Sequence, residues 1–265
     1  MPDGAEIMNE IKKIERVNVL GVGISAINMD LAVRAIIDAI LNKKKGYVCV
    51  TGVHGVMESQ KNQLLRQIHN QSFLCTPDGM PMVWIGKIKG FKFMDRVYGP
   101  DLMLELCKVS SKYNIRHFLF GGANGVANKL KSVLENKFDG IKIVGTYEPP
   151  FRPLNETEKT SLIRTFSDLK PDITWIGLST PKQELFMAEY MQHLNTTIMI
   201  GVGAAFDFHT GRVKQAPQWM QKNGLEWFFR LCMEPRRLWK RYLINNPLFI
   251  LLVTAQLLGL KKYSI

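Results

Sequence analysis

The stretch ITWIGLSTPKQELFMAEYM, residues 173–191, shows the pattern on which the fold of this chain depends. It opens with a short, mostly apolar run that favours a β-strand, turns at a Ser-Thr pair, and continues after Pro181 with a sequence typical of a helix. An apolar run without strict alternation indicates a strand that is covered on both faces, as in a parallel sheet.

The same order of strand, turn and helix recurs along the chain. Further strands are expected at 17–24, 47–51, 117–121, 141–147 and 197–203, and helices at 30–41, 55–69, 100–112, 124–136, 156–169 and 181–191. Repeated strand–helix units predict an α/β fold with a mainly parallel, Rossmann-like sheet flanked by helices.

The C-terminal part departs from this pattern. The run GLEWFFRLCMEPRRLWKRYL, residues 224–243, is basic and aromatic, and PLFILLVTAQLLGL, residues 247–260, is apolar. Cations and amphipathic aromatics next to an apolar segment are typical of a membrane surface. An ordinary terminal helix packed on the protein is the alternative. The 14-residue apolar run is shorter than the roughly 20 residues needed to cross a bilayer.

We therefore expect a polar extension at 1–16, an α/β catalytic core at 17–216 and a helical, membrane-associating appendage at 217–265. The first 15 residues lack the apolar centre of a signal peptide, which predicts a cytoplasmic protein on the inner face of the cell membrane. The net charge of +12 indicates an anionic partner. Because the charge is dense beside the apolar tail, lipid is favoured over nucleic acid, for which the chain carries no recognisable binding module.

The cysteines and histidines do not form a metal site. The four cysteines have no C-x-x-C spacing, so we expect reduced, buried residues at Cys49, Cys75, Cys107 and Cys232. The five histidines are scattered, and no acidic D-x-D pair is present to hold a divalent ion on a diphosphate. The sequence thus predicts neither a metal nor a cofactor.

Two glycine-containing turns are candidates for binding a nucleotide. In FLFGGANG, residues 118–125, Gly121 and Gly122 lie between a strand and a helix, where backbone amides could approach a phosphate; glycine that serves the turn alone is the alternative. Gly21 and Gly23 are weaker candidates, since no acidic ribose-binding partner follows at the required distance.

Two strand ends carry polar side chains. TPDGMPMVW, residues 76–84, follows a strand-like FLC and places Asp78 where it could accept a proton, although Asp before Gly is also a common turn and helix cap. In GLSTPKQE, residues 177–184, Lys182, Gln183 and Glu184 start a helix and could hold a diphosphate or a sugar hydroxyl; an ordinary capped helix is the alternative. GVGAAFDFHTGRVKQAP, residues 201–217, adds Asp207 at another strand end.

Taken in order, six blocks resemble the WecG/TagA/CpsF family of bacterial glycosyltransferases over residues 17–243. They are TPDGMPMVW, RVYGPDLM, FLFGG, GLSTPKQE, GVGAAFDFHTGRVKQAPQWM and GLEWFFRLCMEPRRLWKRYL. The resemblance implies an inverting transfer, without a metal, of a hexose or N-acetylhexosamine from a UDP-sugar to a polyprenyl-diphosphate-linked saccharide in the biosynthesis of a surface polysaccharide or related glycopolymer. The family's donors include UDP-N-acetylmannosamine, its uronic acid and UDP-glucose. A non-catalytic, membrane-associated nucleotide-binding scaffold is the alternative.

The resemblance also implies residue roles. Asp78 is the expected general base, Thr51 and Gln183 lie around the donor sugar, Arg96 stabilises the departing UDP phosphate, and Asp207 recognises uracil or ribose. His54 stands where several members carry an asparagine, and it could donate to a sugar hydroxyl, act as a base, or simply start a helix.

The appendage is expected to close over the active site at the membrane. Its arginines, which could bind either lipid headgroups or substrate diphosphates, are Arg230, Arg236, Arg237 and Arg241. Glu226 and Glu234 are the carboxylates available to pair with them.

Overall fold

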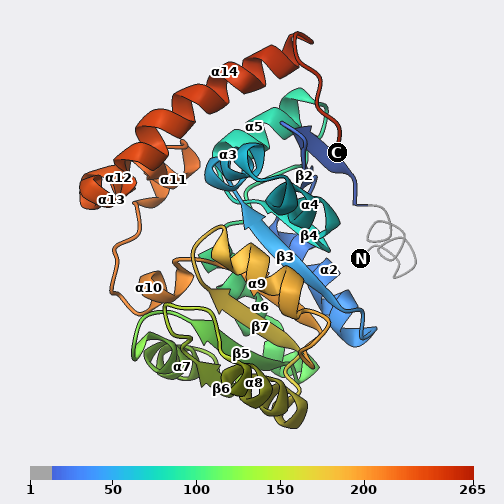
Figure 1. Cartoon of the computed structure of the whole chain (residues 1–265), viewed down its shortest axis with the longest axis vertical. Coiled ribbons are helices and arrows are strands. Elements are labelled where there is room, and N and C mark those ends of the chain that lie inside the picture. Colours follow the sequence, from blue (N-terminus) through green and yellow to red (C-terminus); the bar gives the residue numbers. More distant parts are fainter. Residues whose placement is uncertain (1–13) are drawn as a thin grey trace. The chain divides into compact units, whose positions relative to one another are not determined.

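The computed structural model describes residues 14–265, so most of the predicted N-terminal extension lies outside the described residues. The chain divides into two compact units. Unit 1 contains the N-terminal segment through Ala32 together with Val50–Tyr98 and Gln215–Ile265, and unit 2 contains Val33–Cys49 and Gly99–Lys214. The predicted appendage at 217–265 falls within unit 1 (Figure 1), and its boundary with a catalytic core remains a prediction.

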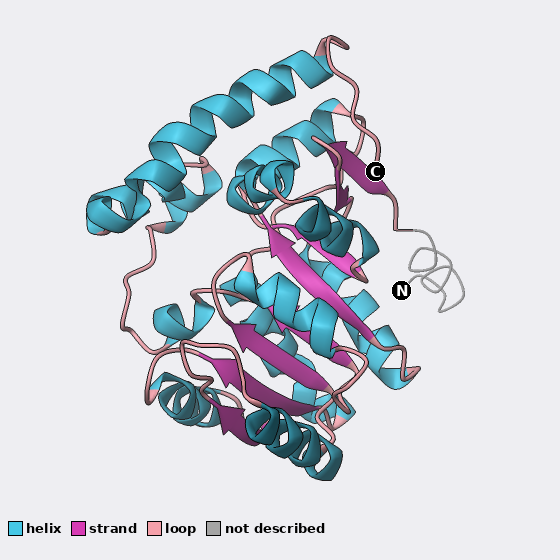
Figure 2. Cartoon of the chain, viewed as in Figure 1, coloured by secondary structure: helices cyan, strands magenta, loops and turns pink. Residues whose placement is uncertain are grey.

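The main sheet has six strands in the order β4-β3-β8-β7-β5-β6. The pairings of β3 with β8, β8 with β7, β7 with β5, and β5 with β6 are all parallel, and helices flank the strands (Figure 2). The strands are β3 (Gly46–Thr51), β4 (Leu74–Pro77), β5 (Arg116–Gly121), β6 (Lys142–Tyr147), β7 (Ile173–Gly177) and β8 (Ile198–Gly201). The predicted α/β fold with a parallel sheet is confirmed.

Unit 2 carries most of the helices that alternate with these strands. They are α6 (Gly99–Tyr113), α7 (Val126–Lys137), α8 (Glu156–Leu169), α9 (Lys182–Tyr190) and α10 (Ala205–His209), with α2 (Met29–Leu41) beginning in unit 1. The core strands are buried because their side chains are large and apolar, as at Phe118, Trp175 and Ile200.

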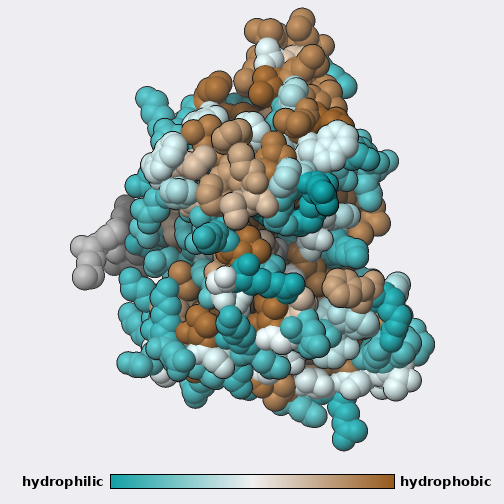
Figure 3. All heavy atoms as spheres, turned by 90° about the vertical axis from the view of Figure 1, so that its left-hand side faces the viewer, coloured by the Kyte–Doolittle hydropathy of each residue, from teal (hydrophilic) through white to brown (hydrophobic). Residues whose placement is uncertain are grey.

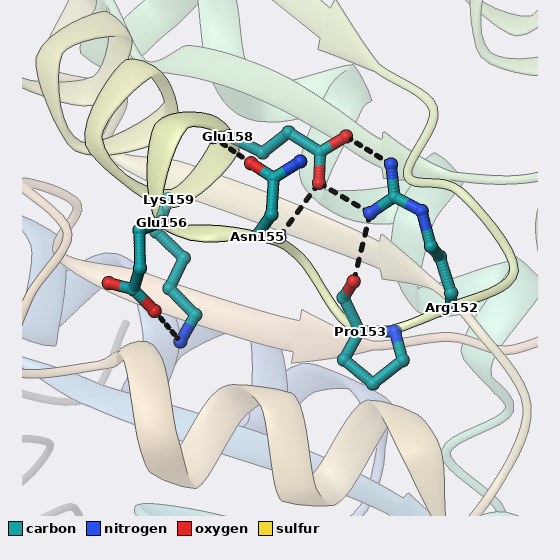
Figure 4. A network of polar contacts seen from close by, with 6 residues as sticks. All are labelled: Arg152, Pro153, Asn155, Glu156, Glu158 and Lys159. Carbon is teal, nitrogen blue, oxygen red and sulfur yellow. Dashed lines mark hydrogen bonds and ion pairs between the residues drawn. The ribbon is translucent and has the colours of Figure 1, made fainter.

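The β6–α8 connection shows how polar side chains fix a loop in unit 2 (Figure 4). Asn155 and Glu158 form a reciprocal capping box at the start of α8. Both oxygens of Glu158 also accept hydrogen bonds from Arg152, each at 2.7 Å. The hydrogen bonds from Arg152, followed by that from the Asn155 backbone, lower the pKa of Glu158 to about 2.

Two predicted elements in unit 1 are wrong. The expected strand at 17–24 is an antiparallel hairpin of β1 (Arg16–Val19) and β2 (Val22–Ser25), separate from the main sheet. Leu20 and Gly21 both have positive φ, as a two-residue hairpin turn requires. The expected helix at 55–69 is two helices, α3 (Val53–Lys61) and α4 (Gln63–Gln71), because Asn62 is extended and caps α4 with its side chain.

The C-terminal residues are helical, as predicted. They form α11 (Gln218–Lys222), α12 (Glu226–Met233), α13 (Pro235–Trp239), the π-helical η1 (Lys240–Ile244) and α14 (Asn245–Leu257), while α5 (Met80–Ile88) follows β4. No helix within residues 14–265 combines the length and the apolar character needed to span a membrane.

Three of the four predicted cysteines are buried, and none of the four forms a disulfide bond with another described residue. Cys232 is exposed instead of buried, because α12 is a surface helix without a single fully buried residue.

Candidate active site

Asp78 lies directly after β4, where the strand gives way to α5. Its backbone N–H donates to the carbonyl oxygen of Thr51 at 3.1 Å, which ties the turn to the end of β3. The N-cap residue of α5 is Gly79, so Asp78 does not occupy the cap position of that helix. A carboxylate at the end of a sheet strand is placed where open α/β sheets present functional groups.

Arg96 contacts the backbone of Asp78. Its Nε donates to the Asp78 carbonyl oxygen at 2.6 Å and its Nη1 to Gln221 Oε1 at 3.0 Å, while Nη2 is hydrogen-bonded to Glu226 Oε2. The guanidinium lies 3.9 Å from the centre of the Tyr98 ring. Tyr98 in turn donates to Glu226 Oε1 at 3.1 Å. The appendage therefore reaches the Asp78 turn through α11 and α12.

Charges around Asp78 alter the pKa values of its neighbours. Burial alone would lower the pKa of Arg96, but the negative charges of Asp78 and Glu226 raise it above its ordinary value. Burial raises the pKa of the Tyr98 phenol, and the same two carboxylates raise it further. Arg96 is thus held as a cation and Tyr98 as a neutral donor.

The four arginines predicted in the appendage fall into two pairs. Arg230 and Arg241 are largely shielded from water and lie within electrostatic range of Asp78, whereas Arg236 and Arg237 are exposed. Arg237 forms two hydrogen bonds of 2.6 Å with Glu234, which confirms that Glu234 pairs with an appendage arginine. Glu226 pairs with Arg96 and also lies within electrostatic range of Arg230.

Arg241 is buried without enough nearby negative charge or hydrogen-bond acceptors to offset the loss of water. Its Nε atom is buried and makes no hydrogen bond to the described part of the chain. Burial lowers the pKa of Arg241, and the positive charges of Arg230 and Arg237 lower it further, against the opposing effects of Tyr242 and Asp78. Buried cations in this state favour an anionic ligand.

Thr51 and His54, the other sugar-site candidates of unit 1, lie three residues apart in the sequence. Thr51 is buried, and its hydroxyl oxygen has no hydrogen-bond partner among residues 14–265. His54 is half-buried in the first turn of α3. The other predicted site residues in unit 1 are Asp78, Arg96, Arg230, Arg236, Arg237 and Arg241.

In unit 2 the predicted glycines allow close backbone packing. Gly121 has φ +125°, and a Cβ there would lie 2.6 Å from the carbonyl oxygen of Gly177. Gly122 N–H donates to the same oxygen at 3.0 Å. Two amides at the start of α7, of Gly125 and Ala127, donate to the Glu148 carboxylate at 2.9 and 3.0 Å. The Glu148 carboxylate therefore occupies the start of α7, where the sequence predicted a bound phosphate. Contact of Gly121 or Gly122 with a donor remains a prediction.

The start of α9 carries a buried polar network. Gln183 Oε1 accepts from the Gly203 amide at 3.0 Å, and Gln183 Nε2 donates to Glu184 Oε1 at 2.9 Å. Glu184 Oε1 also accepts from Thr180, whereas Lys182 is exposed. Gln183 thus connects the loops that follow β7 and β8.

Asp207 lies in α10, and its carboxylate is 3.8 Å from Arg212 Nε. The roles predicted for Asp207, Lys182, Gln183 and Glu184 in donor binding stay predictions. No cluster of three or more His, Cys, Asp or Glu side chains suited to a metal ion occurs in the part of the chain that the structure describes.

Sequence reasoning missed Tyr98 and Gln221, and it did not connect Glu226 with Arg96. Tyr98 had a signal, because it lies two residues after Arg96 within the RVYGPDLM block. Glu226 is 130 residues from Arg96 along the chain, so only the fold reveals the pair.

Comparisons with known proteins show which family this sequence resembles. The family model described as "Glycosyl transferase WecG/TagA/CpsF family" matches residues 17–263. A Bacillus subtilis protein named N-acetylglucosaminyldiphosphoundecaprenol N-acetyl-beta-D-mannosaminyltransferase is 31% identical over 180 residues, which is 68% of each chain. A protein of the same name from Bacillus spizizenii is 28% identical over 204 residues, 77% of each chain. This chain therefore belongs to the WecG/TagA/CpsF family of glycosyltransferases.

Proposed function

We propose that this protein is an inverting, metal-independent glycosyltransferase that moves a hexose or N-acetylhexosamine from a UDP-sugar to a polyprenyl-diphosphate-linked saccharide. The observation that carries the proposal is the position of Asp78 at a strand end, within electrostatic range of Arg96, Arg230 and Arg241. A base beside a group of cations is the arrangement required when a hydroxyl is deprotonated and a diphosphate departs.

In the proposed reaction the ionised carboxylate of Asp78 takes the proton of the acceptor hydroxyl. The hydroxyl oxygen attacks the anomeric carbon of the donor from the face opposite UDP, and the bond from that carbon to the UDP oxygen breaks. The leaving oxygen carries the electron pair away as UDP, and the configuration at the anomeric carbon inverts. Asp78 then returns its proton to water.

Arg230 and Arg241 provide the positive charge for the diphosphate, together with Arg96. Three guanidinium groups face two carboxylates, Asp78 and Glu226, which leaves a net positive site. A diphosphate would supply the acceptors that Arg241 Nε lacks within the described chain. Guanidinium groups can stabilise the developing negative charge without a divalent ion.

The names of the relatives order the candidate substrates. Both act, by name, on N-acetylglucosaminyldiphosphoundecaprenol and transfer N-acetylmannosamine. We therefore place UDP-N-acetylmannosamine first among the donors, ahead of its uronic acid and UDP-glucose, and N-acetylglucosamine linked to undecaprenyl diphosphate first among the acceptors. The expected pathway is the synthesis of a surface polysaccharide or related glycopolymer.

We further propose that the protein works as a peripheral protein on the inner face of the cell membrane. On α14, Phe249 and Val253 are buried, whereas Ile250 and Leu251 are about two-thirds exposed, at 65% and 64%. Neighbouring exposed apolar side chains are Leu243, Ile244, Leu248, Leu257, Leu258 and Leu260. Hydrophobic residues gather at the top of Figure 3, the level at which Figure 1 shows α14. With Arg236 and Arg237 exposed nearby in sequence, this surface suits an anionic lipid layer.

The test is a panel of UDP-sugars incubated with a lipid-linked N-acetylglucosamine diphosphate acceptor, with the product detected by mass. The proposal predicts an acceptor mass increased by one sugar residue, and one UDP released for each sugar transferred. UDP binding without transfer from any UDP-sugar in the panel would instead indicate a non-catalytic scaffold.

A further inference from the structure

Arg96 is surrounded by groups of unit 1. Its Nε, Nη1 and Nη2 atoms bond to Asp78, Gln221 and Glu226, and its planar face lies on Tyr98. Each partner restricts the guanidinium in a different direction. A guanidinium has a rigid fork of donors, so fixing Nη1 and Nη2 also fixes the direction of Nε.

Glu226 binds Arg96 through its carboxylate, and both of its oxygens are used. Oε2 accepts from Arg96, and Oε1 accepts from the Tyr98 hydroxyl at 3.1 Å. The side chains of Arg96 and Glu226 are only 14% and 17% exposed. Water therefore screens this pair weakly, and removing the Glu226 carboxylate would leave a largely buried cation with Asp78 as the remaining nearby negative charge.

The turn that carries Asp78 is held at two backbone atoms. The Asp78 N–H donates to Thr51, within the same segment, and the Asp78 carbonyl oxygen accepts from Arg96. The second of these bonds depends on where the guanidinium lies. Glu226 can thus act on the orientation of Asp78 through Arg96.

We propose that Glu226 is a positioning residue of the transfer reaction, which holds Arg96 against the carbonyl oxygen of Asp78 and so fixes the direction of the base. This proposal rests on the proposed function, in which Asp78 is the general base. It assigns α12 a role inside the active site in addition to membrane attachment and to the proposed diphosphate contact of Arg230.

The test compares Glu226→Gln with Glu234→Gln in the full-length chain, using a short, soluble acceptor so that membrane binding does not contribute. Glu234 is a matched control because it also pairs with an arginine on the appendage, but its partner Arg237 is exposed. Glu226→Gln should lower kcat by about 10- to 100-fold, as expected for a displaced reacting group, and change KM for the UDP-sugar by less than about 3-fold. Glu234→Gln should retain the kcat of the unaltered protein.

A double-mutant cycle with Arg96→Lys tests whether the effect passes through Arg96. Lysine keeps the charge but cannot make the same set of directed bonds. If Glu226 acts through Arg96, adding Glu226→Gln to Arg96→Lys should reduce kcat by less than about 3-fold further. Tyr98→Phe, which removes the phenol bond to Glu226 and keeps the ring, should lower kcat by a smaller factor of about 3 and keeps the test available if Glu226→Gln folds poorly.

The outcomes separate this proposal from the proposed function. An unaltered protein that transfers no sugar contradicts the proposed function. An active protein whose kcat is unchanged by both Glu226→Gln and Tyr98→Phe overturns the role of Glu226. The role would also be overturned if the double variant lost kcat by the product of the two single losses, because Glu226 would then act by a route that does not include Arg96.

Discussion

Arg96 Nε donates a hydrogen bond of 2.6 Å to the backbone carbonyl oxygen of Asp78, so the candidate base and a buried cation are joined through one turn. This contact explains how residues of the appendage can matter to chemistry at a strand end of the sheet. Gln221 and Glu226 hold Arg96, and Arg230 and Arg241 complete the positive surroundings of Asp78.

The division of the appendage arginines predicts two different phenotypes. Arg230→Gln and Arg241→Gln should each lower turnover on a short, soluble acceptor by about 10- to 100-fold, because buried contacts to a diphosphate are lost. Arg236→Gln with Arg237→Gln is the matched control pair, since both side chains are exposed. That pair should reduce binding to anionic liposomes and leave soluble turnover unchanged. Equal losses of soluble turnover in both sets would refute the division.

The two faces of α14 should respond differently to a polar substitution. Ile250→Ser with Leu251→Ser should weaken sedimentation with anionic liposomes while leaving the unfolding midpoint nearly unchanged, because both side chains are exposed. Val253→Ser, on the buried face, should lower the free energy of unfolding by about 1–3 kcal/mol. Liposome binding that survives the double substitution would show that this face of α14 does not attach the protein to lipid.

Transfer should not depend on a divalent ion, because guanidinium groups are proposed to stabilise the leaving diphosphate. The measurement is the initial rate with a soluble acceptor after exhaustive chelation and gel filtration. We expect the rate to stay within about 2-fold of the untreated protein. Activity that disappears on chelation and returns only with magnesium or manganese would reveal a metal-dependent reaction.

A buried histidine in unit 2 predicts how stability changes with pH. Trp175 Nε1 donates to His117 Nδ1 at 3.0 Å, so Nε2 carries the proton toward Ser110 Oγ, 2.7 Å away. Burial lowers the pKa of His117 to about 4, from an ordinary value of 6.5. Between pH 6.5 and 4, His117 therefore binds a proton in the unfolded chain but not in the folded protein. Its contribution to the free energy of unfolding is fully present above pH 6.5 and is lost as the pH falls to about 4.

This contribution should amount to about 3 kcal/mol over that interval, as an order of magnitude. It can be measured by urea unfolding at pH 4.5, 5.5 and 7, compared with His117→Asn, which cannot titrate in this range. The free energy of unfolding of the unaltered protein should fall more steeply with acid than that of the variant. Parallel curves for the two proteins would show that His117 does not titrate as the structure implies.

The sequence could predict the parallel sheet because its strands are continuous apolar runs, as at 173–178, and its helices have clear starts, as at Pro181. It could not predict the hairpin at 17–24. In that segment the apolar pattern resembles the other strands. The two-residue turn between β1 and β2 begins at Leu20, an unusual residue for a position with positive φ.

The candidate site shows the same limit. Asp78 could be proposed from its own turn, since a strand end and a Pro-Asp-Gly sequence are local features. The contact between Arg96 and Glu226 could not, because nothing in either local sequence specifies a partner 130 residues away. The sequence likewise does not distinguish among the four appendage arginines. Only the packing of the helices shows that Arg230 and Arg241 are shielded from water, whereas Arg236 and Arg237 are exposed.

The most direct test of the central claim is the rate of sugar transfer by Asp78→Asn, measured beside UDP affinity on the same preparation. Asparagine preserves the size of the side chain and its place in the turn but cannot take the acceptor proton. We predict a fall in turnover of about 10²- to 10⁴-fold, with UDP affinity within about 3-fold and an unchanged unfolding midpoint. Turnover near that of the unaltered protein would contradict the assignment of Asp78 as the base and, with it, the proposed mechanism.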